Sequence, residues 1–101
     1  MESPILIDVW TVDSSRRDEL ARRISDGVCE VIVGRPGFVS AELYESNDGG
    51  AMIVMVRMRT IEQRQGLTDS PEAHELIRGL QAIARSHIRL YRLAESFGES
   101  D

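Results

Sequence analysis

The chain has 101 residues, of which 42% are hydrophobic and 29% charged, and its formal net charge is −5. This length predicts a single domain, residues 1–101, ordered over roughly residues 4–97 and ending in a short flexible tail at residues 98–101. All twelve basic residues are arginines, and they are scattered among acidic residues. The clustered positive face of a nucleic-acid-binding protein is therefore missing, and we expect no nucleic-acid partner.

The cysteine content and the hydropathy pattern together bear on the compartment of the protein. A single cysteine, Cys29, excludes an intrachain disulfide, and we expect its side chain to be a small buried apolar group. The first residues lack the pattern of a signal peptide. No apolar stretch approaches the roughly 18 residues that cross a bilayer. We expect a cytoplasmic protein without a membrane partner.

The first half of the sequence predicts a strand, a helix and a second strand. Residues 5–12 are mostly apolar and β-branched, as in a strand. Ser15 and Asp18 approximate a capping box at the start of the helix, and Gly34 is placed to end it in the left-handed conformation. Residues 38–46 alternate between apolar and polar, which indicates the second strand. Apolar residues recur at helical spacing between the two strands: Leu20, Ile24, Val28, Val31 and Ile32.

The middle of the sequence predicts a hairpin. Residues 47–50 read Asn-Asp-Gly-Gly, and these residue types tolerate the positive φ angles of tight hairpin turns. Residues 51–59 are again rich in apolar and β-branched side chains. We therefore expect a third strand that pairs with the second.

The last third of the sequence predicts helical segments and a final strand. Thr60 is placed to cap a short helical segment, and Asp69 or Ser70 to cap a longer helix with Pro71 at its first position. Residues 88–97 read as the last strand. The resulting order, β-α-β-β-α-β, predicts an α+β, ferredoxin-like domain with a four-stranded antiparallel sheet and both helices on one face. The stripe expected to be buried on the longer helix comprises Leu76, Ile77, Leu80, Ile83 and Ala84.

Both faces of the predicted sheet are apolar. The first strand places Ile7 and Val9 on one face and Leu6 and Trp10 on the other, and the third strand repeats this pattern. Two helices can cover only one of these faces, and the other would be a larger apolar patch than monomers usually expose. We therefore expect a homodimer that packs sheet against sheet. The alternative is that arginines keep the open face hydrated.

Three segments together resemble the antibiotic biosynthesis monooxygenase family. They are residues 9–12 (Val-Trp-Thr-Val), residues 35–40 with a Pro-Gly-Phe turn, and residues 69–74 (Asp-Ser-Pro-Glu-Ala-His). The resemblance covers residues 5–97. It implies a dimeric α+β barrel with a pocket between each sheet and its own helices. It also implies oxidation of aromatic polyketides by O₂ with no cofactor and no metal.

The same resemblance leaves other activities open. Val54 and Met58 stand where many oxygenases of the family carry Asn and Trp, so a non-oxidative cyclase or isomerase is an alternative. A non-catalytic binding protein is a second alternative. Haem-degrading relatives are matched only at His74. Asp8 and a polar stretch near Arg64 stand in place of their other haem-site residues. Haem degradation is therefore the weakest hypothesis.

Two candidate catalytic residues follow. Asp8 is an acid within an apolar strand, and a desolvated carboxyl with a raised pKa suits a general base acting on a phenol or an activated C–H. A structural acceptor of hydrogen bonds is an equally good reading of Asp8. His74 is a candidate acid–base partner because imidazole titrates near neutral pH, although an exposed helix residue is the simpler interpretation.

The expected ligand is a small aromatic molecule. Trp10 lies on the same strand face as Asp8 and could stack on a flat ring. Val54, Val56 and Met58 would pack against the ring, and Tyr44 could donate its hydroxyl to it. Each of these residues is alternatively an ordinary core or surface residue.

Overall fold

A computed structural model describes residues 4–98 of the chain. Residues 99–101, most of the predicted flexible tail, lie outside the described residues. The predicted order of strands and helices is confirmed. The elements are β1 (Ile5–Thr11), a 3₁₀ turn (Ser14–Arg16), α1 (Arg17–Val31), β2 (Phe38–Glu45), β3 (Ala51–Met58), a second 3₁₀ turn (Ile61–Gly66), α2 (Pro71–Leu80) and β4 (Arg85–Tyr91).

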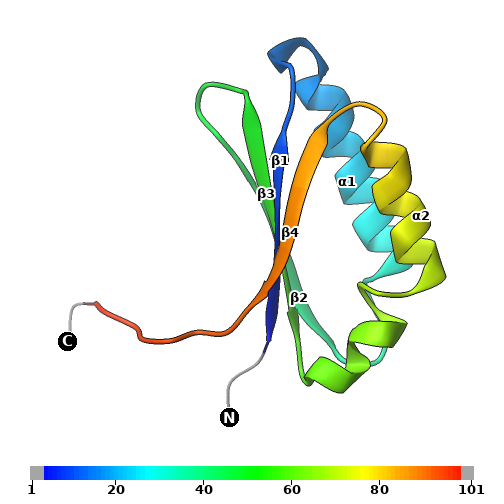
Figure 1. Cartoon of the computed structure of the whole chain (residues 1–101), viewed down its shortest axis with the longest axis vertical. Coiled ribbons are helices and arrows are strands. Elements are labelled where there is room, and N and C mark those ends of the chain that lie inside the picture. The colour runs from blue at the N-terminus through cyan, green and yellow to red at the C-terminus, as the bar shows by residue number, and fades with distance from the viewer. Residues whose placement is uncertain (1–3, 99–101) are drawn as a thin grey trace.

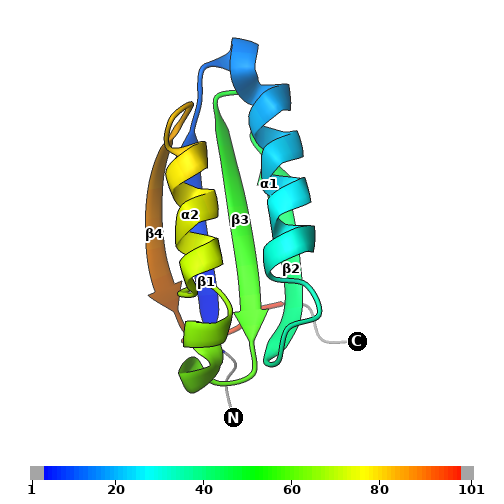
Figure 2. The same cartoon turned by 90° about the vertical axis from the view of Figure 1, so that its right-hand side faces the viewer.

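The four strands form one antiparallel sheet in the order β2-β3-β1-β4. Both helices lie on the same face of this sheet, and no helix or strand of residues 4–98 lies on the opposite face (Figures 1 and 2). The ferredoxin-like α+β fold is therefore confirmed. Among residues 4–98, no helix has the length and apolar character that a membrane span requires.

The core lies between the sheet and the two helices. Alternate residues of β1 and β3 point into it, because side chains along a strand alternate between the two faces. From β1 and β3 it receives Leu6, Trp10, Met52, Val54, Val56 and Met58. Leu20 and Ile24 of α1 and Leu80 of α2 close it from the other side. The two helices approach closely at Gly27, where an added Cβ would lie 2.4 Å from Cδ1 of Leu76.

The start of the first helix differs from the prediction. Asp13, not Ser15, is the capping residue, and its side chain accepts a hydrogen bond from the Ser15 amide at 2.9 Å. The cap precedes the 3₁₀ turn, so the predicted box of Ser15 and Asp18 was wrong. Gly34 has the expected positive φ of 84°, but it lies two residues after Ile32, the C-cap, and so does not itself end the helix as predicted. Cys29, predicted to be buried, is exposed, because it lies on a face of α1 that does not enter the core.

The second helix begins as predicted. Ser70 is its N-cap, and its Oγ accepts a hydrogen bond from the Ala73 amide at 3.1 Å, with Pro71 in the first turn. The helix ends at Leu80, however, and Ile83 and Ala84 belong to the following turn. These two residues continue the apolar spacing of the helix although they connect it to β4.

The last strand also differs from the prediction. It spans Arg85–Tyr91 rather than residues 88–97, because residues 85–91 pair with the whole of β1. Residues 92–98 form no strand and run away from the domain on the side of the open sheet face (Figures 1 and 2). Every residue of this segment is exposed, and Phe97 is 84% exposed. The apolar residues Leu93 and Phe97 made the segment resemble a continuing strand.

Candidate active site

Asp8 lies at the centre of the sheet and faces the helices. Its β1 position pairs with Val54 of β3 on one side and with Ile88 of β4 on the other. The residue is only 8% exposed. It lines a cavity whose other walls come from both sheet and helices, and these walls are almost entirely apolar. They include Trp10, Val54, Val56, Thr68, Leu76 and Ile77.

Three buried polar atoms of this cavity have no hydrogen-bond partner among residues 4–98. They are Oδ1 of Asp8, Nε1 of Trp10 and Oγ1 of Thr68. Burying a polar atom without a partner costs about 1–3 kcal/mol, so such atoms are uncommon in folded proteins. Because all three line one cavity, a ligand that enters it could pair with all of them. The trio contains a carboxyl, an N–H donor and a hydroxyl.

Burial raises the pKa of Asp8 from 3.8 to about 7, because the apolar walls disfavour the charged form. The Trp10 indole lowers the same pKa by a smaller amount, although its N–H does not reach a hydrogen bond of full geometry. A carboxyl with a pKa near 7 is present both as acid and as base at neutral pH. This is the property that a general base requires.

The cavity is small, at about 50 Å³, whereas ligand pockets typically measure about 300–1,000 Å³. It adjoins a more open groove of about 410 Å³ between α2 and β4. Leu6, Thr68 and Ile77 line both spaces. The groove and the cavity therefore share part of their walls.

His74 lines the groove and not the cavity of Asp8. Its Nε2 lies 2.6 Å from Oδ1 of Asp69, and its side chain is 55% exposed. The structure therefore does not bring His74 together with Asp8 as the sequence suggested. His74 can still contact the part of a ligand that remains in the groove.

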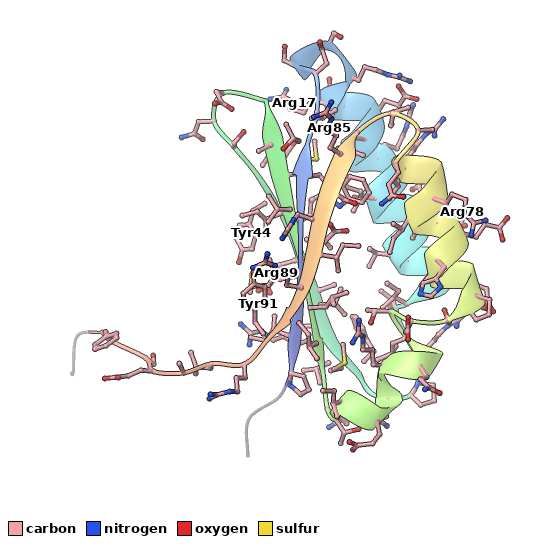
Figure 3. The ribbon with its side chains drawn as sticks, in the orientation of Figure 1. Arg17, Tyr44, Arg78, Arg85, Arg89 and Tyr91 are labelled. Carbon is pink, nitrogen blue, oxygen red and sulfur yellow. The ribbon has the colours of Figure 1, made fainter. Side chains whose placement is uncertain are left out.

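The predicted ligand-contacting residues divide between three environments. Trp10, Val54 and Val56 line the cavity together with Asp8. Met58 has an exposure of 0% and belongs to the core beside the cavity without lining it. Tyr44 is 51% exposed and projects from the sheet face opposite the helices (Figure 3). Tyr44 and the cavity are thus on opposite sides of the sheet, because Tyr44 pairs with the outward-facing Ile53.

Sequence reasoning missed Thr68. A threonine just before a helix cap looks like an ordinary turn residue, and only the folding of this turn over the sheet makes Thr68 line the same cavity as Asp8. Among residues 4–98, no group of three His, Cys, Asp or Glu side chains is arranged to hold a metal ion.

Comparison with solved structures identifies proteins with the same fold. The monooxygenase ActVA-Orf6 from Streptomyces coelicolor, solved with the ligand nanaomycin D, superposes with a TM-score of 0.82 at 21% identity, over 98% of this chain and 94% of that one. The cofactor-independent oxygenase SnoaB from Streptomyces nogalater superposes with a TM-score of 0.72 at 14% identity, over 98% of this chain and 100% of that one. The chain has the fold of these two oxygenases.

The fold also occurs in a third protein of known structure. Rv0793 from Mycobacterium tuberculosis superposes with a TM-score of 0.70 at 20% identity, over 97% of this chain and 100% of that one. No protein-family model matches the sequence, and a comparison with curated proteins finds no match. The similarity therefore identifies the fold, and the chemistry must be argued from the cavity.

Proposed function

We propose that the protein is a cofactor-free monooxygenase that acts on a small aromatic, polyketide-type substrate, with Asp8 as the general base. The observation that carries this proposal is the convergence of three unpaired polar atoms on one otherwise apolar cavity. The oxygenase activity of two proteins with the same fold supports the choice of reaction.

The reaction requires only one proton acceptor and O₂. Asp8 removes a proton from a phenol-activated methylene, and the apolar walls keep water away from the resulting carbanion. The carbanion transfers one electron to O₂, and the radical pair combines to a peroxide that takes up a proton. Loss of the second C–H proton together with cleavage of the O–O bond gives the ketone and one water. Both atoms of O₂ are accounted for, and no external reductant is consumed.

Within this scheme, Trp10 binds the substrate oxygen. Among the buried side chains of residues 4–98, its indole N–H is an N–H donor without a hydrogen-bond partner, and it lines the same cavity as Asp8, so it can stabilise the phenolate that forms when the proton leaves. Val54 and Val56 provide a flat apolar surface for the ring. His74 stays in the groove, where it contacts the remainder of the substrate.

The first test is oxygen uptake with an anthrone as substrate. We expect uptake above the spontaneous rate, and Asp8→Asn should lower it about 10²–10⁴-fold, the usual contribution of a general base. The rate should rise with pH through an apparent pKa near 7, since only the ionised Asp8 accepts the proton. Asp26→Asn, which changes an exposed carboxyl on α1, is the matched control. Full activity of Asp8→Asn would exclude Asp8 as the base.

A second candidate is a polyketide cyclase. Where the resemblance places an amide and an indole on the third strand, this chain has Val54 and Met58, so two polar groups expected in many oxygenases of the family are missing. The same deprotonation by Asp8 would then start an aldol closure with loss of water. Substrate turnover without oxygen uptake, still dependent on Asp8, would favour this alternative.

We further propose that the protein works as a homodimer through its open sheet face. Ile7, Val9, Ile53 and Met55 form the centre of this face, and Val9 and Ile53 are 38% and 37% exposed. Residues 92–98 extend on the same side, where a second copy would lie (Figure 1). Burying this centre and Phe97 against a partner would remove an apolar patch that monomers rarely tolerate.

The charges at the edges of this face suggest the symmetry of the dimer. Glu42, Met55, Ile7 and Arg89 form one row across the sheet, with the acid on one edge strand and the arginine on the other. A two-fold axis parallel to the strands would place each edge strand over the opposite edge strand of the second copy. Glu42 would then face the partner's Arg89, and this would occur twice.

Sedimentation of charge variants tests this arrangement. Glu42→Arg and Arg89→Glu should each weaken the dimer because like charges would meet, and the double variant should restore it. Rescue in the double variant supports the parallel axis. Two-fold packing about an axis perpendicular to the strands would give no rescue, and a wild-type monomer would refute the dimer altogether.

A further inference from the structure

The groove beside the cavity contains two arginines without a carboxylate partner. Arg64 follows β3 in the second 3₁₀ turn, and Arg78 lies on α2, one turn after His74 (Figure 3). Among residues 4–98, neither guanidinium has an acidic group within 4.0 Å. The acid that lines the groove, Asp69, is engaged with His74 at 2.6 Å. The groove thus carries an excess of positive charge although the whole chain has a net charge of −5.

A second, independent feature points to a ligand at the same place. Thr68 is only 7% exposed, and its Oγ1 has no partner although it lines both the groove and the cavity. A hydroxyl in this position can hydrogen-bond to a molecule that extends from one space into the other. The two arginines and Thr68 therefore line one groove, and Thr68 also lines the cavity that contains Asp8.

We propose that this groove is the subsite for a carboxylate carried by the aromatic substrate, with Arg64 and Arg78 as its specificity-determining residues. This inference rests on the proposed function, because it assumes that the ring reaches Asp8. A guanidinium binds a planar carboxylate through two parallel hydrogen bonds, which makes arginine suited to select an acid over its ester. The apolar side chains of Leu6 and Ile77 lie between the two ends and contact the body of the substrate.

The placement has a consequence for the reaction. A carboxylate bound at Arg64 and Arg78 keeps one end of the substrate in the groove, so the ring can enter the cavity in only one direction. The substrate carboxylate also remains away from Asp8, whose ionised form would repel it. The subsite therefore determines which carbon of the ring system meets the base.

Binding can be measured without any turnover, because Trp10 is the single tryptophan and lines the cavity. The experiment follows the quenching of its fluorescence by anthraquinone-2-carboxylate and by the methyl ester of the same compound. We expect the acid to bind at least about tenfold more tightly than the ester, because a hydrogen bond between two charged groups is stronger than one to a neutral ester. Arg64→Gln and Arg78→Gln should each remove most of this preference.

Arg22→Gln is the matched control, because Arg22 is exposed on α1 and lines neither the groove nor the cavity. It should leave the preference for the acid unchanged. Equal binding of acid and ester, no binding of the acid, or an equal loss of preference in Arg22→Gln would overturn the subsite. Oxygen uptake and its dependence on Asp8 are measured separately with an uncharged anthrone. The carboxylate subsite can therefore be refuted while the proposed reaction is supported, and the reaction can be refuted while the subsite is supported.

Discussion

The two faces of the sheet contain similar apolar residues but differ in where their polar groups lie. On the face under the helices, a carboxyl occupies the centre at Asp8 and the surrounding side chains are apolar. On the open face the centre is apolar, and charged residues such as Glu42 and Arg89 stand on the edge strands. A polar group in the middle of an apolar surface needs a partner that enters the cavity. Polar groups around an apolar centre form the rim that protein–protein interfaces usually have.

The largest expected difference between the faces concerns two methionines of β3. Met52 faces the helices with an exposure of 1%, whereas Met55 faces outward. Met52→Ala should lower the free energy of unfolding by about 2–5 kcal/mol, the usual cost of such a cavity. Met55→Ala should cost the monomer much less and mainly weaken the dimer. Urea unfolding at low protein concentration, combined with sedimentation, measures both effects, and equal unfolding costs would contradict the distinction.

The next effect concerns the charge at the centre of the covered face. The folded pKa of Asp8, about 7, exceeds its ordinary value of 3.8, so between these pH values the folded protein holds a proton that the unfolded chain has released. Stability therefore falls as the pH rises through this range, and the loss between pH 5 and pH 8 is roughly 2–3 kcal/mol. Asp8→Asn should lack this loss. Thermal unfolding of both proteins at the two pH values checks this, and parallel curves would contradict a raised pKa.

The sequence predicted the two faces well and the ends of the elements poorly. Alternation along β1 and β3 identifies which residues share a face, because it depends only on strand geometry. It also placed Asp8 and Trp10 together, since they are two residues apart on one strand. The end of α2 was missed because Ile83 and Ala84 continue its spacing while they form the turn into β4.

Contacts between distant segments were outside the reach of sequence patterns. Thr68 and Asp8 line one cavity only because the turn before α2 folds over the sheet, and no local sequence pattern encodes that fold. The sequence also could not place Tyr44 on the open face of the sheet. Alternation along an edge strand does not tell which of its two faces the helices cover. Pairing of Tyr44 with Ile53 settles its direction.

A smaller effect separates two glycines of the helices that cover the inner face. An added Cβ at Gly27 would lie 2.4 Å from Leu76, whereas at Gly79 nothing lies within 4 Å. Gly79→Ala should stabilise the protein by about 0.5–1 kcal/mol through helix propensity. Gly27→Ala should not stabilise the protein, because the new Cβ would crowd Leu76. It should also push Leu76 into the cavity and so weaken ligand binding. Thermal unfolding and quenching of Trp10 test both variants, and equal behaviour would exclude close helix packing at Gly27.

The smallest change in stability should come from a hydroxyl of the site itself. Ser70 and Thr68 are both buried, but Ser70 accepts from the Ala73 amide and donates to the Leu67 carbonyl, whereas the Thr68 hydroxyl has no partner within residues 4–98. Ser70→Ala should therefore cost about 0.5–2 kcal/mol, the usual loss for a helix cap. Thr68→Val keeps the shape and removes only an unpaired group, so it should be neutral or stabilising by less than about 1 kcal/mol.

The same Thr68→Val variant should bind anthraquinone-2-carboxylate more weakly than the wild type does, because the hydroxyl meets its partner only when a ligand is bound. Stability and binding then change in opposite directions, which is the pattern of a residue kept for function at some cost to the fold. A marked loss of stability would mean that Thr68 has a structural partner in the folded protein. Unchanged binding would mean that Thr68 does not contact the ligand.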